Sequence, residues 1–449
     1  MWKVLLNRTY RHLFLAQVVA LLGTGMLTVA LGLLAYQLAG ANAGSVLGTA
    51  LAIKMVAYVL IAPVVGAFAN RLPRRAFLVT MDLVRAGVAV SLPFVTEVWQ
   101  IYILIFLLQS ASAAFTPTFQ ATIPDVLPEE NDYTQALSLS RLAYDMESLV
   151  SPMLTAALLT VISFHWLFSG TVVGFIASAL LVVSVRLPRP AGKAPSGGIF
   201  AKTFRGISIY LRTPRLRGLL GLNLAAAAAS SMVIVNTVVY VQARLGRPAS
   251  DVPLGLASFG FGSMLMAFTL PKLLEKRADR PLMLLGAALM TAGLAAGAVV
   301  TAVGGPYEWA AFLLTWFVIG LGYSTTLTPS GRLLRRSANA DDRPAVFAAQ
   351  FSLSHVCWLI TYPIAGTVGA ALGMTATFVI LAVIGAAGLV AAAVCWPRDD
   401  GDILEHEHEH GPGPDSDSST PHLAEGEQTG PRRHRHAFQI DDQHTRWPE

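Results

Sequence analysis

Long apolar runs dominate this sequence and constrain its fold more than any other feature. Of its 449 residues, 54% are hydrophobic and only 13% are charged, whereas soluble proteins carry about 25% charged residues. A helix that crosses a membrane needs roughly 20 predominantly apolar residues. Twelve such runs occur, at 12–38, 45–69, 76–96, 98–122, 134–160, 165–186, 218–243, 253–274, 281–303, 307–330, 344–369 and 374–396. We therefore expect an all-α membrane protein with twelve transmembrane helices.

The basic residues are distributed unevenly between the loops and predict the orientation. Cytoplasmic loops are enriched in Lys and Arg. Five basic clusters fall on one side, at 3–11, 71–75, 186–217, 272–280 and 332–343. The loops of the other side contain only Arg244 and Arg247. We expect a multi-pass protein of the inner (plasma) membrane with both termini in the cytoplasm.

The chain divides into two similar halves. Thr116-Pro117 and Ser151-Pro152 in the first half have counterparts in Thr328-Pro329 and Tyr362-Pro363 of the second. Both halves start in the cytoplasm, so the repeat axis lies along the membrane normal. Four segments are expected: a six-helix bundle at 1–186, a basic cytoplasmic linker at 187–217, a second six-helix bundle at 218–396 and a disordered tail at 397–449. Within the linker, 200–216 has the pattern of an amphipathic helix on anionic lipid.

The tail differs from the rest of the chain in charge and in histidine content. Residues 1–396 carry 27 Lys and Arg against 14 Asp and Glu, whereas 397–449 carry 5 against 13 and hold seven of the ten His. Imidazole is a good ligand for nickel and other borderline divalent metals. We expect no packed fold here but weak binding of such a metal by His406, His408, His410, His434 and His436. A solvated acidic tail without ligands is the alternative.

Several classes of protein are excluded or disfavoured. No phosphate-binding loop of the G-x-x-x-x-G-K-[ST] type occurs, so ATP hydrolysis is not expected. No combination of nucleophile, base and orienting group points to an enzyme, and no resident cofactor is implied. Nor is there a basic face with interleaved aromatic residues for nucleic acid. The expected partners are a small inorganic or organic substrate, protons and the lipid bilayer, with the protein as a monomer.

Five ionisable residues inside the apolar runs are the main candidates for a functional role, because charge is costly there and usually functional. They are Lys54, Asp82, Arg85, Asp145 and Glu147. Asp82 and Arg85 are three residues apart and favour a structural pair. With a rise of about 1.5 Å per residue, Lys54 and the two acids of the fifth run all fall roughly 16–20 Å from the inner face.

Asp145 and Glu147 are the strongest candidates for substrate or proton binding in the first half. Asp145 can instead pair with Arg141 on its own helix face. Glu147 has no local partner, so Lys54 or a proton is expected to neutralise it. The second half has His355 and Cys357 at the corresponding place, where their imidazole and thiol are candidate ligands for a transition metal. Residues two apart lie about 200° apart on a helix, so only one of each pair can face a given ion; packing is the alternative for His355 and Cys357.

The loop after the second apolar run resembles a known family signature. Gly66-Ala-Phe-Ala-Asn-Arg-Leu-Pro-Arg-Arg75 resembles the signature G-x-x-x-D-R-x-G-R-R of the major facilitator superfamily. The resemblance implies two six-helix bundles in the major facilitator fold and a gating role for Gly66, Asn70, Arg71, Arg74 and Arg75. Two residues depart from the signature, Asn70 in place of Asp and Pro73 in place of Gly. It also implies that the first, fourth, seventh and tenth helices line a pathway, where Gln109, Asn223, Asn236 and Tyr323 are candidates.

A second resemblance concerns residues 328–363. Thr328-Pro-Ser-Gly-Arg-Leu-Leu-Arg-Arg336, Phe347 to Trp358 and Thr361-Tyr-Pro363 are similar to the nickel-resistance exporters of the NreB type, which also tend to end in a His-rich tail. This resemblance implies export of nickel, with cobalt as a further cargo.

The expected function is therefore secondary active export of a divalent transition metal from the cytoplasm by proton antiport. Two alternatives stay open. One is an exporter of a small organic molecule such as a siderophore or drug. The other, of a different class, is a membrane metal sensor or scaffold.

Overall fold

The computed structural model describes residues 2–68, 73–188, 199–274, 276–338 and 342–398, together with the backbone of 403–408 and 432–437. Helices make up nearly all of it. In the first half these are α1 (Arg8–Ala39), α2 (Ala43–Phe68), α3 (Arg74–Ser91), α4 (Val98–Val126), α5 (Glu130–Leu159) and α6 (His165–Val183).

The second half repeats the pattern after a linker helix. The elements are α7 (Ile199–Arg212), α8 (Pro214–Val239), α9 (Val252–Leu274), α10 (Asp279–Val303), α11 (Glu308–Leu327), the short α12 (Ser330–Arg336) and α13 (Arg343–Cys395). Two strands follow, β1 (Ile403–His408) and β2 (Arg432–Ala437). A π-helical turn, Tyr240–Arg244, extends α8.

The predicted twelve spans are confirmed. Nine apolar segments of the described chain are long enough to cross a membrane. One of them joins α1 to α2, and another covers all of α13. Gly373 divides α13, because its φ of 81° and ψ of 175° are not helical and its positive φ favours glycine. The acidic helix α5 completes the twelve. Hydrocarbon offers no water to the backbone, so helices satisfy their own hydrogen bonds.

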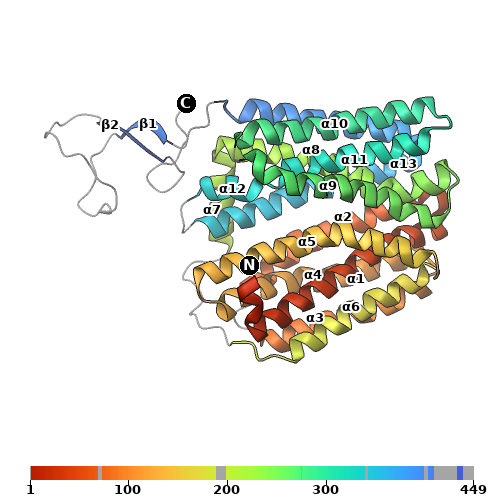
Figure 1. Ribbon diagram of the computed structural model, residues 1–449, viewed down its shortest axis with the longest axis horizontal. Coiled ribbons are helices and arrows are strands. Elements are labelled where there is room, and N and C mark those ends of the chain that lie inside the picture. The colour runs from red at the N-terminus through yellow and green to blue at the C-terminus, as the bar shows by residue number, and fades with distance from the viewer. Residues whose placement is uncertain are drawn as a thin grey trace.

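The spans form two bundles that lie side by side, α1–α6 in one and α8–α13 in the other (Figure 1). The start of α1, the end of α13, α7 and α12 lie at the same end of the bundles. This end also holds Arg74 and Arg332, which belong to the basic clusters. The arrangement is that of two six-helix bundles, as the sequence predicted.

The bundles meet mainly where α2 crosses α13, and α5 contacts α9 beside them. The crossing is close because it is built on glycine. A Cβ on Gly48 would lie only 2.5 Å from the carbonyl oxygen of Tyr362, and one on Gly44 would lie 3.7 Å from the carbonyl oxygen of Gly366. Small residues let helix backbones approach in membranes, where lipid removes the hydrophobic driving force between helices. This contact lies near the start of α2, at the end of the bundles away from the start of α1.

Ion pairs join helices at the opposite end of the bundles. The third span begins with the arginine of the pair in the first half and with the acid in the second half. Arg74 at the start of α3 pairs with Asp125 near the end of α4. In the second half Asp279 at the start of α10 pairs with Arg332 and Arg336 of α12, directly after α11. Asp279 is only 2% exposed, and Arg332 Nε donates to its Oδ1 at 3.0 Å. The third and fourth spans of each half are thus joined by one acid and at least one arginine.

The linker helix α7 packs against α13. Arg205 donates to Asp342 through Nε at 2.6 Å and Nη2 at 3.0 Å, and Tyr210 donates to Gln350. The amphipathic segment expected at 200–216 is therefore anchored to the second bundle. The helix also ends earlier than expected, at Arg212, because Pro214 begins the next helix. Proline is favoured at the first position of a helix, where its missing backbone N–H would have no partner within the helix.

The two strands of the tail were not predicted, since the sequence indicated no regular structure there. They pair antiparallel, with His406 opposite His434, Leu404 opposite His436 and His408 opposite Arg432. Directly paired residues of an antiparallel ladder share a face, and the faces alternate along each strand. One face therefore carries His406, His408, His434 and His436.

Replacing Gly48 by Leu should prevent the α2–α13 crossing from closing, because any side chain there meets the Tyr362 carbonyl. Cysteines introduced near this end should react faster with a membrane-impermeant thiol reagent. Gly87→Leu is the matched control, because a Cβ on Gly87 meets none of the described atoms within 4 Å. Equal labelling of both variants would contradict this role of the crossing.

Replacing Asp279 by Asn should destabilise the protein by about 1–3 kcal/mol, since it removes a buried acceptor of charged hydrogen bonds. Asp251→Asn is the control. Arg247, four residues earlier, pairs with it at 2.7 Å, and the carboxylate of Asp251 is more exposed than that of Asp279, so its loss should cost less than about 1 kcal/mol. Thermal unfolding of both variants in detergent measures the difference; equal shifts would show that burial of the pair does not matter.

Candidate functional site

A cluster of polar and aromatic side chains lies where the two bundles face one another. Lys54 and Tyr58 come from α2, Glu147 from α5, and Phe351 and His355 from α13. Lys54 and Tyr58 are one helical turn apart, as are Phe351 and His355, so each pair shares a helix face. The cluster therefore joins three of the helices that form the interface between the bundles.

His355 is held among aromatic rings. Its ring stacks on Tyr58 with centroids 5.7 Å apart and an interplanar angle of 6°. Phe351 lies 4.0 Å away and Trp358 6.5 Å away, again between centroids. These contacts fix the imidazole against α2 of the other bundle.

The hydrogen bond of His355 defines its chemistry. Nδ1 lies 2.6 Å from the carbonyl oxygen of Phe351, and because a carbonyl only accepts, Nδ1 carries the proton. In the neutral ring Nε2 is then an acceptor. Metal-binding histidines typically donate their other ring N–H to a carbonyl or carboxylate in this way. His355 thus has the tautomer that a metal ligand or proton acceptor requires.

Lys54 of α2 is within electrostatic reach of both the Glu147 carboxyl group and the His355 imidazole. It interacts with Glu147 and with His355, and its Nζ is 5.9 Å from the centroid of Tyr58. Glu147 packs against α1, where its Cγ is 3.5 Å from the place of a Cβ on Gly25. The partner suggested for Glu147 by the sequence is therefore within electrostatic reach, while the role of both residues in transport stays a prediction.

Asp82 and Arg85 form the structural pair that their spacing favoured. Arg85 donates to Asp82, and the Ser178 hydroxyl donates to the other carboxylate oxygen at 2.8 Å. The Arg85 guanidinium lies 4.3 Å from the centroid of Phe115 and 4.5 Å from that of Phe175. This pair belongs to the interior of the first bundle.

Other predicted residues lie outside the cluster or outside the described side chains. Cys357 is 6% exposed and donates back to the Leu353 carbonyl at 3.6 Å; because it is two residues from His355 on the same helix, it lies on a different face. Asp145 lies in α5, but its side chain is outside the described part. Among the described residues, no group of three or more His, Cys, Asp or Glu is arranged to hold a metal.

The candidate pathway residues mostly make contacts within the protein. Asn223 donates to the Leu219 carbonyl of its own helix at 2.8 Å. Asn236 donates to the Ala365 carbonyl at 3.0 Å and so joins α8 to α13. Gln109 is buried in α4, and Tyr323 of α11 packs on Phe259. Their predicted role as substrate contacts is untested.

The predicted gating loop is described only in part. Gly66 lies in α2, whereas Asn70 and Arg71 are outside the described residues. Arg74 pairs with Asp125, and Arg75 donates to the carbonyl of Val183 at the end of α6. In the tail, the backbone of His406, His408, His434 and His436 lies in the paired strands, and His410 is outside the described residues.

Tyr58, Phe351 and Trp358 were missed by sequence reasoning. Each of them lies about one helical turn from Lys54 or His355, and this spacing could have indicated them. It is a weak indication, because aromatic residues are common in membrane helices.

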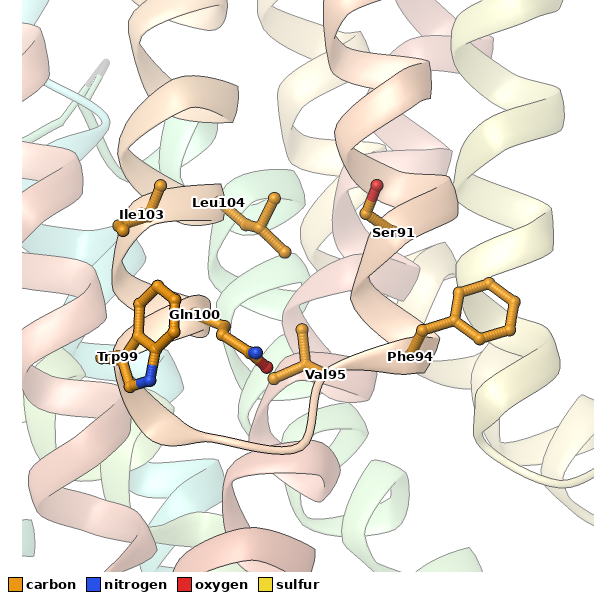
Figure 2. A pocket seen from close by; sticks show the side chains of 7 residues that line it. All are labelled: Ser91, Phe94, Val95, Trp99, Gln100, Ile103 and Leu104. Carbon is orange, nitrogen blue, oxygen red and sulfur yellow. The ribbon is translucent and has the colours of Figure 1, made fainter.

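A hollow of about 270 Å³ lies elsewhere, at the turn between α3 and α4 (Figure 2). Its lining consists of Ser91, Phe94, Val95, Trp99, Gln100, Ile103 and Leu104. The Gln100 side chain already accepts from the backbone N–H groups of Thr96 and Glu97. Phe94 and Trp99 are 79% and 59% exposed, which is typical of aromatic residues at a membrane interface. No predicted site residue lines this hollow.

Comparison with known proteins agrees with this architecture. An uncharacterised MFS-type transporter of Bacillus subtilis, YfiS, is 24% identical over 72% of this chain and 78% of its own length. Macrolide efflux protein A of Streptococcus pyogenes is 24% identical, but over only 43% of this chain and 48% of its own.

Solved structures show the same fold. The nucleoside transporter NupG superposes with a TM-score of 0.71 at 12% identity, covering 87% of this chain and 100% of that one. A D-xylose–proton symporter has a TM-score of 0.61 at 15% identity and covers 88% and 97%. The family model described as Major Facilitator Superfamily matches residues 13–246 and 219–434. The chain is therefore a transporter, not an enzyme, and belongs to the major facilitator superfamily.

Proposed function

We propose that this transporter exports a divalent transition-metal ion, nickel first and cobalt second, from the cytoplasm by proton antiport. The observation that carries the proposal is the cluster between the bundles, where the carboxylate of Glu147 and the Nε2 atom of His355 come from different halves. Carboxylate and imidazole are both ligands for nickel. In an alternating-access carrier, a site between the halves can face either side of the membrane in turn.

The ion in such a site keeps part of its water. One carboxylate and one imidazole leave most positions of a six-coordinate metal to solvent, which suits a cargo that must be released. Asp145 is a further candidate ligand or proton carrier on the same helix as Glu147. The basic loops support a cytoplasmic location of both termini, and the tail is then on the side from which the cargo is taken.

The paired strands of the tail support a metal-binding role on that side. An isolated two-stranded ladder is marginally stable in water. A metal bound by His406 and His434, which are directly paired, would stabilise it. On the other face Glu405 is paired with Arg435, and Glu407 with Arg433; opposite charges across a ladder favour this register.

Export of a small organic molecule is a second candidate, favoured by the relatives named macrolide efflux protein A. The rings of Tyr58, Phe351 and Trp358 around His355 would suit such a cargo as well. In this case the tail would be incidental.

We expect proteoliposomes with the cytoplasmic face outward and an acidic lumen to accumulate radioactive nickel saturably. Protons leave the lumen as nickel enters, so an uncoupler should abolish the accumulation. Accumulation of a macrolide without nickel flux would instead support the second candidate. Binding of nickel without any flux would overturn both and point to a sensor.

Replacing Glu147 by Gln should lower nickel flux by about ten- to a hundredfold, because a charged contact of about 1.5–3 kcal/mol is lost. Glu97→Gln is the control. Glu97 is an exposed N-cap of α4, and Gln preserves its shape while removing its charge. Full transport by the Glu147 variant would exclude Glu147 from the pathway.

Replacing both His406 and His434 by Ala in the full chain should remove one class of nickel site in a calorimetric titration. Maximal flux should persist while the nickel concentration for half-maximal flux rises. Replacing His12, which lies at the start of α1 and contacts the Arg8 carbonyl, is the control. An unchanged titration would show that the tail binds no nickel through these residues.

A further inference from the structure

We propose that Asn236 of α8 favours opening of the carrier at the α2–α13 crossing, because closure buries its side-chain oxygen without a hydrogen-bond partner. The crossing is the contact in which Gly44 and Gly48 of α2 pack on Gly366 of α13. The two bundles meet there whatever the cargo is, so this role of Asn236 does not depend on the proposed export of a metal ion.

The hydrogen bond of Asn236 fixes the orientation of its amide. Nδ2 lies 3.0 Å from the carbonyl oxygen of Ala365, and because a carbonyl only accepts, the atom that faces it is the nitrogen. Asn236 is fully buried, and its Oδ1 has no hydrogen-bond partner within the described part of the chain. A buried acceptor without a partner bears the full cost of losing its water.

Two glycines cover this oxygen, one from each bundle. A Cβ on Gly44 of α2, or on Gly369 of α13, would lie 2.9 Å from Oδ1 of Asn236, so neither position has room for a side chain there. The CH₂ group of a glycine offers an acceptor at most a weak C–H contact. The first bundle therefore covers the oxygen without pairing with it.

The other contacts of Asn236 stay within the second bundle. Its bond to the Ala365 carbonyl joins α8 to α13. A second link between the same helices is made by the hydroxyls of Ser231 and Thr361, which are 2.7 Å apart. When the bundles rock apart, α2 is the helix that leaves Asn236. Water can then reach Oδ1, so opening removes the cost that closure imposed.

The rest of the crossing favours closure. A Cβ on Gly48 would lie 2.5 Å from the Tyr362 carbonyl oxygen and 3.2 Å from Cα of Gly366, and such close backbone packing stabilises helix contacts in membranes. A contact of this kind without an opposing contribution would hold the bundles closed. The unpaired oxygen brings the free energies of the closed and open states closer together, and a carrier has to populate both states in turn.

The open fraction can be measured on the full chain in detergent, without any cargo. Ala43→Cys places a thiol at the start of α2, where the native side chain is 2% exposed; Cys357 and Cys395 are replaced by Ala in every sample. Closure shields this thiol from a polar reagent, so the rate of its modification follows the open fraction even when that fraction is small. Gly48→Leu should raise the rate.

Asn236→Leu should lower the modification rate by about five- to a hundredfold, because the unpaired acceptor is replaced by an apolar group of similar shape. Asn236→Val also lacks the acceptor and should change the rate in the same direction, which covers the case in which Leu does not fit. Thr315→Val is the matched control. The Thr315 side chain is buried in the same bundle, but its hydroxyl donates to the Ala311 carbonyl of its own helix at 2.7 Å, so the rate should not change.

A purely structural role of Asn236 predicts a different result. If Asn236 acted only through its bond to Ala365, its loss would loosen the second bundle, and the modification rate would stay the same or rise. Either result in Asn236→Leu protein that is folded, as judged by thermal unfolding, would overturn the proposal. So would an unchanged rate in Gly48→Leu, because the crossing would then not control access to this end of the bundles.

Discussion

The close crossing of α2 and α13 is the contact on which the rest of the arrangement depends. Gly48 and Gly366 let the two backbones approach, and the helices run in opposite directions from there. Tyr58 of α2 is thereby brought against Phe351 and His355 of α13. The same crossing that joins the bundles therefore also assembles the candidate site, so a change in the contact at one end alters the geometry of the cluster further along.

Charge is handled differently at the ends of the bundles and at their interface. At the end that holds the start of α1, Arg74 with Asp125 and Asp279 with two arginines join neighbouring helices within a bundle. Inside the first bundle, Asp82 and Arg85 are paired on one helix. Lys54 and Glu147, by contrast, come from different helices at the interface. The fixed pairs therefore lie within a bundle, whereas Lys54 and Glu147 lie on helices that meet at the interface between the bundles.

Most of the fold was predictable because it follows from local composition. Each span is recognisable in the sequence as a run of apolar residues. The break within α13 falls at Gly373, between two such runs. The pairing of Asp82 with Arg85 was predictable because their spacing is short. The stacking of Tyr58 on His355 was not, because it depends on how two helices far apart in the sequence cross.

By itself the sequence determined the number of spans, the two repeated halves and a histidine-rich tail of opposite charge, because hydrophobicity and charge are properties of single residues and short segments. Only the tertiary structure decided which polar residues meet. It brought Glu147 and His355, from two other helices, within electrostatic reach of Lys54 and set His406 opposite His434. Those outcomes depend on helix crossing and strand register, which are fixed by packing between distant segments.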